Sequence, residues 1–382
     1  MKKKHTIIIL TIIISILLTG CWDKIEINNR GFVIGLGIDK LKEDEKNKEG
    51  DKIKVSFKIP NVALLGTKQT PTKEPSFYWE AEGETFDTVI NEIQSKSPFD
   101  LELSHNKVII IGRDILKDKA LFKQILDGVD RNRFFSRKIF MLVSKEKASD
   151  IIKIRPNEQP LVGVYYGNIL DSAVKNGTVI DGTLNKLMKE MEETETTILP
   201  LTTKTYNNKR IEIIGGSIIK DYEIREELNE TECRFLNMII KNNYNIMNIH
   251  VDYKNVPVSY KITSTKSETK VSEKDNKLLL DIYVDTEGDV TQHEFGVKGL
   301  IANDKGIRDI EKLSEEKIKE NINSLINKLK KNSLDVINVE NILYKYHQPL
   351  YKKINEDFDQ YFKNMEVKVH VESKIRRIGI VR

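Results

Sequence analysis

The residues with the clearest chemical potential lie near the amino terminus, at one of the 2 cysteines of the chain. Leu18, Thr19 and Gly20 place an aliphatic residue and two small residues directly before the thiol of Cys21. A thiol is needed to form a thioether with a diacylglyceryl group, and small neighbours let a signal peptidase reach an extended backbone. We therefore expect cleavage between Gly20 and Cys21 and a covalent diacylglycerol on Cys21, whose two acyl chains suffice for stable anchoring. The alternative is an unmodified cysteine that follows an ordinary signal.

The segment before this cysteine has the layout of an export signal. Residues 2–4 are lysines, and residues 6–18 are almost wholly aliphatic. At about 1.5 Å per helical residue this run spans roughly 20 Å, which is short of the ~30 Å hydrocarbon core of a bilayer. We therefore interpret residues 1–20 as a cleaved lipoprotein signal peptide, resembling the bacterial lipobox type, rather than as a membrane-spanning helix.

Patterns typical of catalysis are weak elsewhere in the chain. Gly35 and Gly37 could begin a dinucleotide-binding turn, but a charged segment follows where that motif needs a helix. The histidines are isolated in sequence, and Cys233 has no nearby histidine and is expected to be a buried thiol in a helix. The acidic pairs Glu192–Glu193 and Glu226–Glu227 are interpreted as solvated faces. We expect a protein that is not an enzyme, with no metal site and no cofactor other than the diacylglycerol at Cys21.

The charge balance argues against nucleic acid as a partner. Lys2, Lys3 and Lys4 supply three of the 62 basic residues, so the rest of the chain carries 59 against 58 acidic residues, a net charge of +1. This leaves no basic excess to neutralise phosphates.

A length of 382 residues with 39% hydrophobic residues predicts a folded body of more than one domain.

The periodicity of the apolar residues predicts an α+β fold, with mixed sheets packed by helices. Residues 21–200 are expected to form an α/β region of two subdomains, and residues 206–382 an α+β domain with long strands and a long amphipathic helix. A threonine-rich stretch around Leu199 is taken as the boundary, and we expect any small-ligand site there. Within the second domain we expect a capped helix from residue 229, a chain turn at residues 285–290, and a helix over 314–331 capped by Ser314.

Residues 21–40 carry a motif that resembles the start of the mature Ger(x)C family, the C subunits of bacterial spore germinant receptors. The segments 86–98, 105–112 and 215–232 are similar to later parts of the same family. The matching residues, for which we consider a structural or interface role, are Cys21, Trp22, Asp23, Glu26, Arg30, Gly31, Gly37, Asp39, His105, Asn106 and Lys107.

This resemblance implies a lipid-anchored, non-enzymatic body on the outer face of the inner spore membrane. It implies two membrane-embedded partners, the A and B subunits of the receptor, and a role in nutrient-triggered germination. Whether the chain itself binds a small germinant stays open. The alternative function is an extracellular solute-binding lipoprotein that feeds a transporter, and two doubly wound βαβ lobes would favour it.

Overall fold

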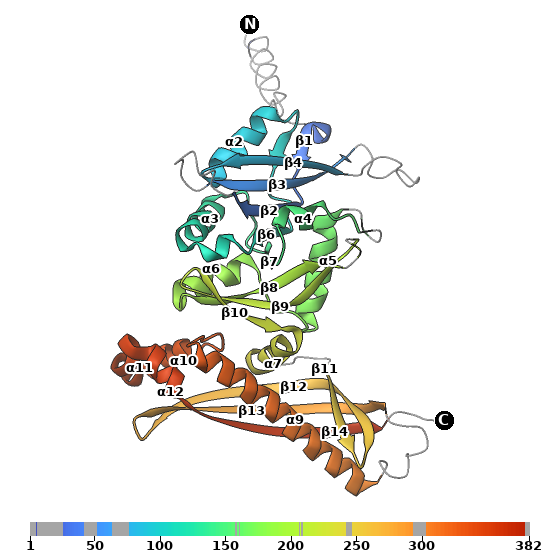
Figure 1. Cartoon of the computed structure of the whole chain (residues 1–382), viewed down its shortest axis with the longest axis vertical. Coiled ribbons are helices and arrows are strands. Elements are labelled where there is room, and N and C mark those ends of the chain that lie inside the picture. Colours follow the sequence, from blue (N-terminus) through green and yellow to red (C-terminus); the bar gives the residue numbers. More distant parts are fainter. Residues whose placement is uncertain are drawn as a thin grey trace.

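The computed structural model describes residues 26–41, 52–62, 76–156, 161–205, 209–241, 247–292 and 303–378, together with positions 5, 159 and 207. It is an elongated body of two lobes (Figure 1). An eight-stranded sheet forms the first lobe, and a four-stranded sheet crossed by a long helix forms the second. This agrees with the predicted α+β class.

The eight-stranded sheet is parallel in its centre and antiparallel at both ends. Its strand order is β10-β9-β8-β7-β6-β2-β3-β4, and β2, β6, β7 and β8 run parallel. The strands are β2 (Gly35–Lys40), β3 (Ile53–Pro60), β4 (Ser76–Gly83), β6 (Val108–Gly112), β7 (Phe140–Ser144), β8 (Thr196–Lys204), β9 (Ile211–Lys220) and β10 (Glu223–Asn229).

Helices cover both faces of this sheet, which explains why its central strands read as continuous apolar runs. Ile109 and Ile111 of β6 face α2 (Phe86–Lys96), α3 (Lys119–Arg131) and α6 (Leu184–Glu193). Val108 and Ile110 face α4 (Ala148–Lys153) and α5 (Val162–Lys175). All residues of β6 are buried.

A small two-stranded sheet lies beside the first lobe, near the beginning of the described chain. The 3-10 helix η1 (Ile27–Asn29) leads into β1 (Arg30–Phe32), which pairs in parallel with β5 (Asp100–Glu102). Figure 1 shows β1, α2 and β4 at one end of the long axis and the second lobe at the opposite end.

The sheet of the first lobe continues beyond the boundary expected at residues 200–206. That stretch lies in β8 and in the connection to β9, and β8 pairs with β9 from Thr196↔Lys220 to Lys204↔Ile211. The polar threonines that suggested a linker are strand residues, and Thr196, Thr197 and Thr202 are buried. The two sheets are instead joined through α7 (Glu230–Ile240), which packs in one apolar cluster with Ile198 and Ile218 and with the second sheet.

The second lobe is a sheet of long strands in the order β11-β12-β13-β14. The first three strands are antiparallel, and β14 lies parallel to β13. Both hairpins turn on a pair of residues with positive φ, Lys254–Asn255 and Asp275–Asn276, as two-residue turns of type I′ require. The strands are β11 (Met247–Tyr253), β12 (Val256–Lys274), β13 (Lys277–Gln292) and β14 (Glu366–Ile378).

Helix α9 (Asp304–Lys331) lies across this sheet, and three short helices connect it to β14 (Figure 1). Its buried stripe includes Ile318, Ile322, Leu325 and Leu329. The connecting helices are α10 (Val339–Tyr346), α11 (Gln348–Ile354) and α12 (Phe358–Asn364). This lobe is not a doubly wound βαβ unit, so the structure does not favour the solute-binding alternative.

Two local predictions for this lobe are wrong. Residues 285–290 do not turn the chain; they continue β13 and pair with β12 and β14. Gly288 lies at a shift in strand register, where a Cβ would lie 2.2 Å from the carbonyl oxygen of Lys261. Glycine here allows the close approach of a β-bulge. Ser314 does not begin the helix: α9 begins at Asp304, the side chain of Asn303 accepts the Gly306 N–H, and Ser314 is buried in the helix interior.

Candidate functional site

Asp39, from the amino-terminal motif, caps a helix that is remote in sequence. Its two carboxylate oxygens accept the backbone N–H groups of Ala148 and Ser149 at 2.7 and 2.9 Å. The N-cap residue of α4 is Lys147, whose side chain makes no capping bond, so Asp39 supplies the missing acceptor. Gly112 leaves the room for it, because a Cβ there would lie 2.5 Å from Asp39 Oδ1. Asp39 therefore fixes α4 against the central strands.

The neighbouring motif residue Gly37 serves the same contact. A Cβ at this position would lie 3.0 Å from the backbone carbon and oxygen of Ala148. The absence of a side chain thus lets the first turn of α4 lie directly on β2. The Gly-Ile-Asp part of the motif is accounted for by this helix–sheet contact.

The other described motif residues gather around β1 and β5. Arg30 Nη1 lies 3.4 Å from Glu102 Oε2, and the ring of His105 meets that of Phe32 edge to face at 5.0 Å. Asn106 is buried, and its Oδ1 accepts the Val108 N–H at 3.4 Å. The exposed Lys107 donates its backbone N–H to the Ile34 carbonyl at 3.2 Å. These contacts join the start of β6 to β1 and to the segment that follows β1.

The motif residues therefore form two structural clusters rather than one reactive site. Gly31 and Arg30 lie in β1, whereas Gly37 and Asp39 lie in β2 beside α4. Glu26 is exposed at the start of a described range. Gly20, Cys21, Trp22 and Asp23 lie outside the described residues, so cleavage and lipid attachment stay predictions.

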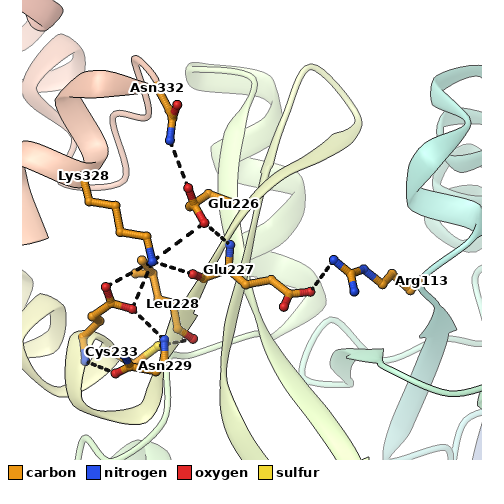
Figure 2. Close-up of polar contacts among 9 residues, drawn as sticks. Arg113, Glu226, Glu227, Leu228, Asn229, Cys233, Lys328 and Asn332 are labelled. Carbon is orange, nitrogen blue, oxygen red and sulfur yellow. Dashed lines mark hydrogen bonds and ion pairs between the residues drawn. The ribbon is translucent and has the colours of Figure 1, made fainter.

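The junction between the two lobes holds a second set of polar residues, which the sequence did not single out (Figure 2). Lys328 of α9 is its centre: Nζ donates to the Glu227 carbonyl at 2.8 Å and to Glu232 Oε1 at 3.1 Å. Glu226 Oε1 lies 3.7 Å from the same nitrogen. The Lys328 side chain is 30% exposed, and those of Glu226 and Glu232 are 28% and 24% exposed. The expectation that Glu226 and Glu227 form a solvated face is wrong.

Two further contacts extend this network (Figure 2). Asn332, after the end of α9, donates from Nδ2 to Glu226 Oε2 at 3.0 Å. Arg113, after the end of β6, pairs with Glu227 Oε1 at 3.0 Å. The network thus connects the second lobe to the carboxyl end of a central parallel strand of the first.

The capped helix predicted from residue 229 is confirmed. Asn229 Oδ1 accepts the Glu232 N–H, and Glu232 Oε2 accepts the Asn229 N–H, which is a capping box. Cys233, in the first turn of α7, is buried as expected, and its Sγ faces the Leu228 carbonyl at 4.0 Å. Burial raises the pKa of the Cys233 thiol to about 12. A thiol in this state is a poor nucleophile.

A cavity of about 590 Å³ lies at the same junction, on the side of the short helices. Its lining includes Glu193–Thr196, which lie shortly before Leu199, the residue around which we expected a ligand site. Lys220 of β9 also lines it. Lys220 Nζ donates to the Ser333 carbonyl at 2.9 Å and to Asp359 at 2.6 Å, so it holds the two lobes together across this cavity.

Two of the carboxylates that line this cavity, those of Asp335 and Glu340, have a raised pKa. Asp335 is buried and accepts the N–H groups of Val339 and Glu340, which caps α10, yet burial raises its pKa to about 6. Burial, together with the charges of Asp335 and Asp359, raises the pKa of the half-buried Glu340 to about 7. Carboxylates outnumber cations around the cavity, where Lys220 and Lys363 are the lysines of its lining.

We predict that Glu340→Gln makes the protein less sensitive to pH. The folded state holds the Glu340 proton more tightly than the unfolded state, so its contribution to stability is full below the usual carboxyl pKa and is lost as pH rises to about 7. The variant should be about 1–2 kcal/mol more stable than the wild type at pH 8 and nearly equal at pH 4.5, after allowance for screening by solvent.

Urea unfolding at both pH values measures this difference. Glu356→Gln is the matched control, because Glu356 lines the same cavity but is exposed. A Glu340→Gln protein with the same pH dependence as the wild type would contradict the prediction.

Sequence reasoning missed these junction residues because their partners are remote. Lys328 meets Glu227 and Glu232 about a hundred positions earlier, and Lys220 meets Asp359 more than a hundred positions later. One local signal was available: an aspartate four residues before Val339 caps the helix that begins there.

Among the described residues no group of three or more His, Cys, Asp or Glu is arranged to hold a metal ion. Within that same part of the chain, no helix is both long and apolar enough to cross a membrane.

The fold is similar to that of a solved structure, and two family models match the sequence. The crystal structure of the GerBC protein superposes with a TM-score of 0.60 at 15% identity, covering 89% of this chain and 97% of that chain. The family model described as spore germination protein N-terminal domain matches residues 23–204, and the one described as spore germination B3/GerAC like, C-terminal, matches residues 214–379. The chain belongs to the GerAC/GerBC family of spore germination C subunits.

Curated relatives agree over most of their length. The spore germination protein KC of Bacillus subtilis (strain 168) is 20% identical over 100% of this chain and 97% of its own. The spore germination protein A3 of the same strain is 23% identical over 73% of this chain and 72% of its own. The resemblance found in the sequence motifs is therefore confirmed at the level of the family.

Proposed function

We propose that this protein is the lipid-anchored C subunit of a spore germinant receptor, a non-enzymatic component that contacts membrane-embedded A and B subunits. The observation that carries the proposal is that both lobes match the family over almost all of the chain after residue 22. The aliphatic–small–small–cysteine pattern at residues 18–21 supports an anchor. The proposed location of the anchored body is the outer face of the inner spore membrane, as the family resemblance implies.

The described residues support a role in protein contact rather than catalysis. The amino-terminal motif builds a helix cap and a strand junction, and Cys233 is buried with a raised pKa. The acidic cavity at the lobe junction is the first place to look for a small ligand, because such sites form preferentially between domains. Direct binding of a germinant by this subunit is not part of the proposal.

We predict that Cys21→Ala leaves the fold intact and slows nutrient-triggered germination by about tenfold or more, because loss of the anchor removes the high local concentration at the membrane. Spores that carry the variant would be compared with a deletion strain across amino acids, bile salts and sugars. Cys233→Ala is the matched control, because it removes the other thiol without touching the anchor.

Three results would count against the proposal. Mass spectrometry that finds an unmodified Cys21 in the mature protein would remove the anchor. A pull-down from spore membranes that recovers neither an A nor a B subunit would remove the receptor assembly. Normal germination of the deletion strain toward every nutrient would contradict a role in nutrient-triggered germination.

A further inference from the structure

The described residues nearest the proposed anchor include one exposed apolar side chain. Ile27, in η1, is 65% exposed. From Cys21 to Glu26 the chain takes five steps, which at about 3.5 Å each allow at most about 17 Å of extended backbone. Glu26, the residue directly before η1, is thus held within that distance of Cys21.

A row of aromatic side chains lies beside β1. Phe99 directly precedes β5, the partner of β1, and its ring stacks on those of Phe77 and Trp79 with centroids 5.8 and 6.3 Å apart. Phe77 and Trp79 pack against the apolar cluster of the first lobe, and all three rings keep part of their surface exposed. A Cβ on Gly31 would lie 3.1 Å from Phe99 Cβ, so β1 and this aromatic row are in direct contact.

This end of the molecule is suited to the interface of a bilayer. Tryptophan and other aromatic rings favour the level of the lipid headgroups, and apolar side chains beside them add buried area. The nearby exposed charges are mixed in sign, with Glu26 and Asp100 against Lys96. The contact would therefore depend on apolar burial and not on attraction to anionic lipids.

We infer that Ile27, Phe77, Trp79 and Phe99 form a membrane-contact surface that rests on the lipid interface beside the acyl anchor. The inference rests on the proposed lipid anchor and deepens it by giving the body an orientation. The long axis then points away from the bilayer, with the second lobe farthest from it (Figure 1).

Trp79 itself reports on this contact, because the chain has 2 tryptophans and the other is Trp22. The full-length acylated protein with Trp22→Phe would be reconstituted in phosphatidylcholine vesicles that contain lipids brominated near the headgroup end of the acyl chains. We expect quenching to remove at least about a third of the Trp79 emission, with the same result when phosphatidylglycerol is added. A protein that also carries Trp79→Phe gives the background.

The added substitution Ile27→Glu tests the surface without disturbing the core, since this side chain is exposed. It should cut the quenching by about half or more by placing a charge at the interface. If the protein is acylated and floats with the vesicles but Trp79 is not quenched, the membrane-contact surface is refuted and the anchor stands. If the protein is not acylated at Cys21, the proposed function and this inference both fail.

Discussion

Replacing Asp39 by asparagine should lower the free energy of unfolding by about 2–3 kcal/mol, measured by urea denaturation at pH 7. The wild-type carboxylate accepts two backbone N–H groups at the start of α4. An asparagine oxygen can accept only one of them, and the amide nitrogen would then face the other N–H donor. Because Asp39 is only 7% exposed, water cannot easily replace the lost acceptor.

Asp150→Asn provides the matched control for this substitution. Asp150 lies in the first turn of the same helix, but its side chain is 46% exposed and pairs with Lys204 only at 3.8 Å. We expect this control to stay within about 0.5 kcal/mol of the wild type. Equal stability of both variants would show that Asp39 is not the cap of α4 in solution.

Replacing Lys328 by methionine should cost about 2–3 kcal/mol of stability. Methionine keeps the apolar length of the side chain but leaves Glu226 and Glu232 without the lysine cation that lies between them, and it leaves the Glu227 carbonyl without this donor. Each of these groups is partly buried at the lobe junction, so the loss is larger than for a surface ion pair. Thermal unfolding followed by calorimetry measures the effect.

Lys331→Met tests the same chemical change three residues further along α9, where the lysine is exposed. This control should leave the unfolding transition unchanged within about 0.5 kcal/mol. A Lys328→Met protein as stable as the control would mean that the Lys328 network adds no stability to the apolar packing of α7 and the Lys220 contacts, which also join the lobes.

Much of the fold could be predicted because apolar periodicity is a local property. The alternation in residues 53–59 defines β3, and the helical spacing after Asn229 defines α7 together with its cap. The wrong predictions lie where one local sequence pattern is compatible with two different structures. Gly288 is compatible with a turn or with a bulge, and only the pairing of β13 with β12 and β14 decides between them. Ser314 is followed by two acidic residues as a cap would be, but Ile310 already continues the buried stripe before it.

The candidate site could be predicted only in part. The motif residues were recognised from the sequence, yet their contacts with Ala148 and Glu102 require the folded sheet. Most of the junction contacts carry no sequence pattern because they join residues that are remote in the chain. Glu227 is an ordinary surface glutamate until Arg113 and Lys328 are brought to it.

The parallel strand β14 has a consequence for how the chain folds. Its partner β13 ends at Gln292, and α9 to α12 intervene before β14 begins at Glu366. Glu311 and Glu315 of α9 accept the N–H groups of Ile375 and Ser373, so the helix must be in place to receive the strand. Closing so long a connection costs chain entropy before any pairing compensates for it. We therefore expect the second lobe to complete its sheet last and to set the slow phase of refolding.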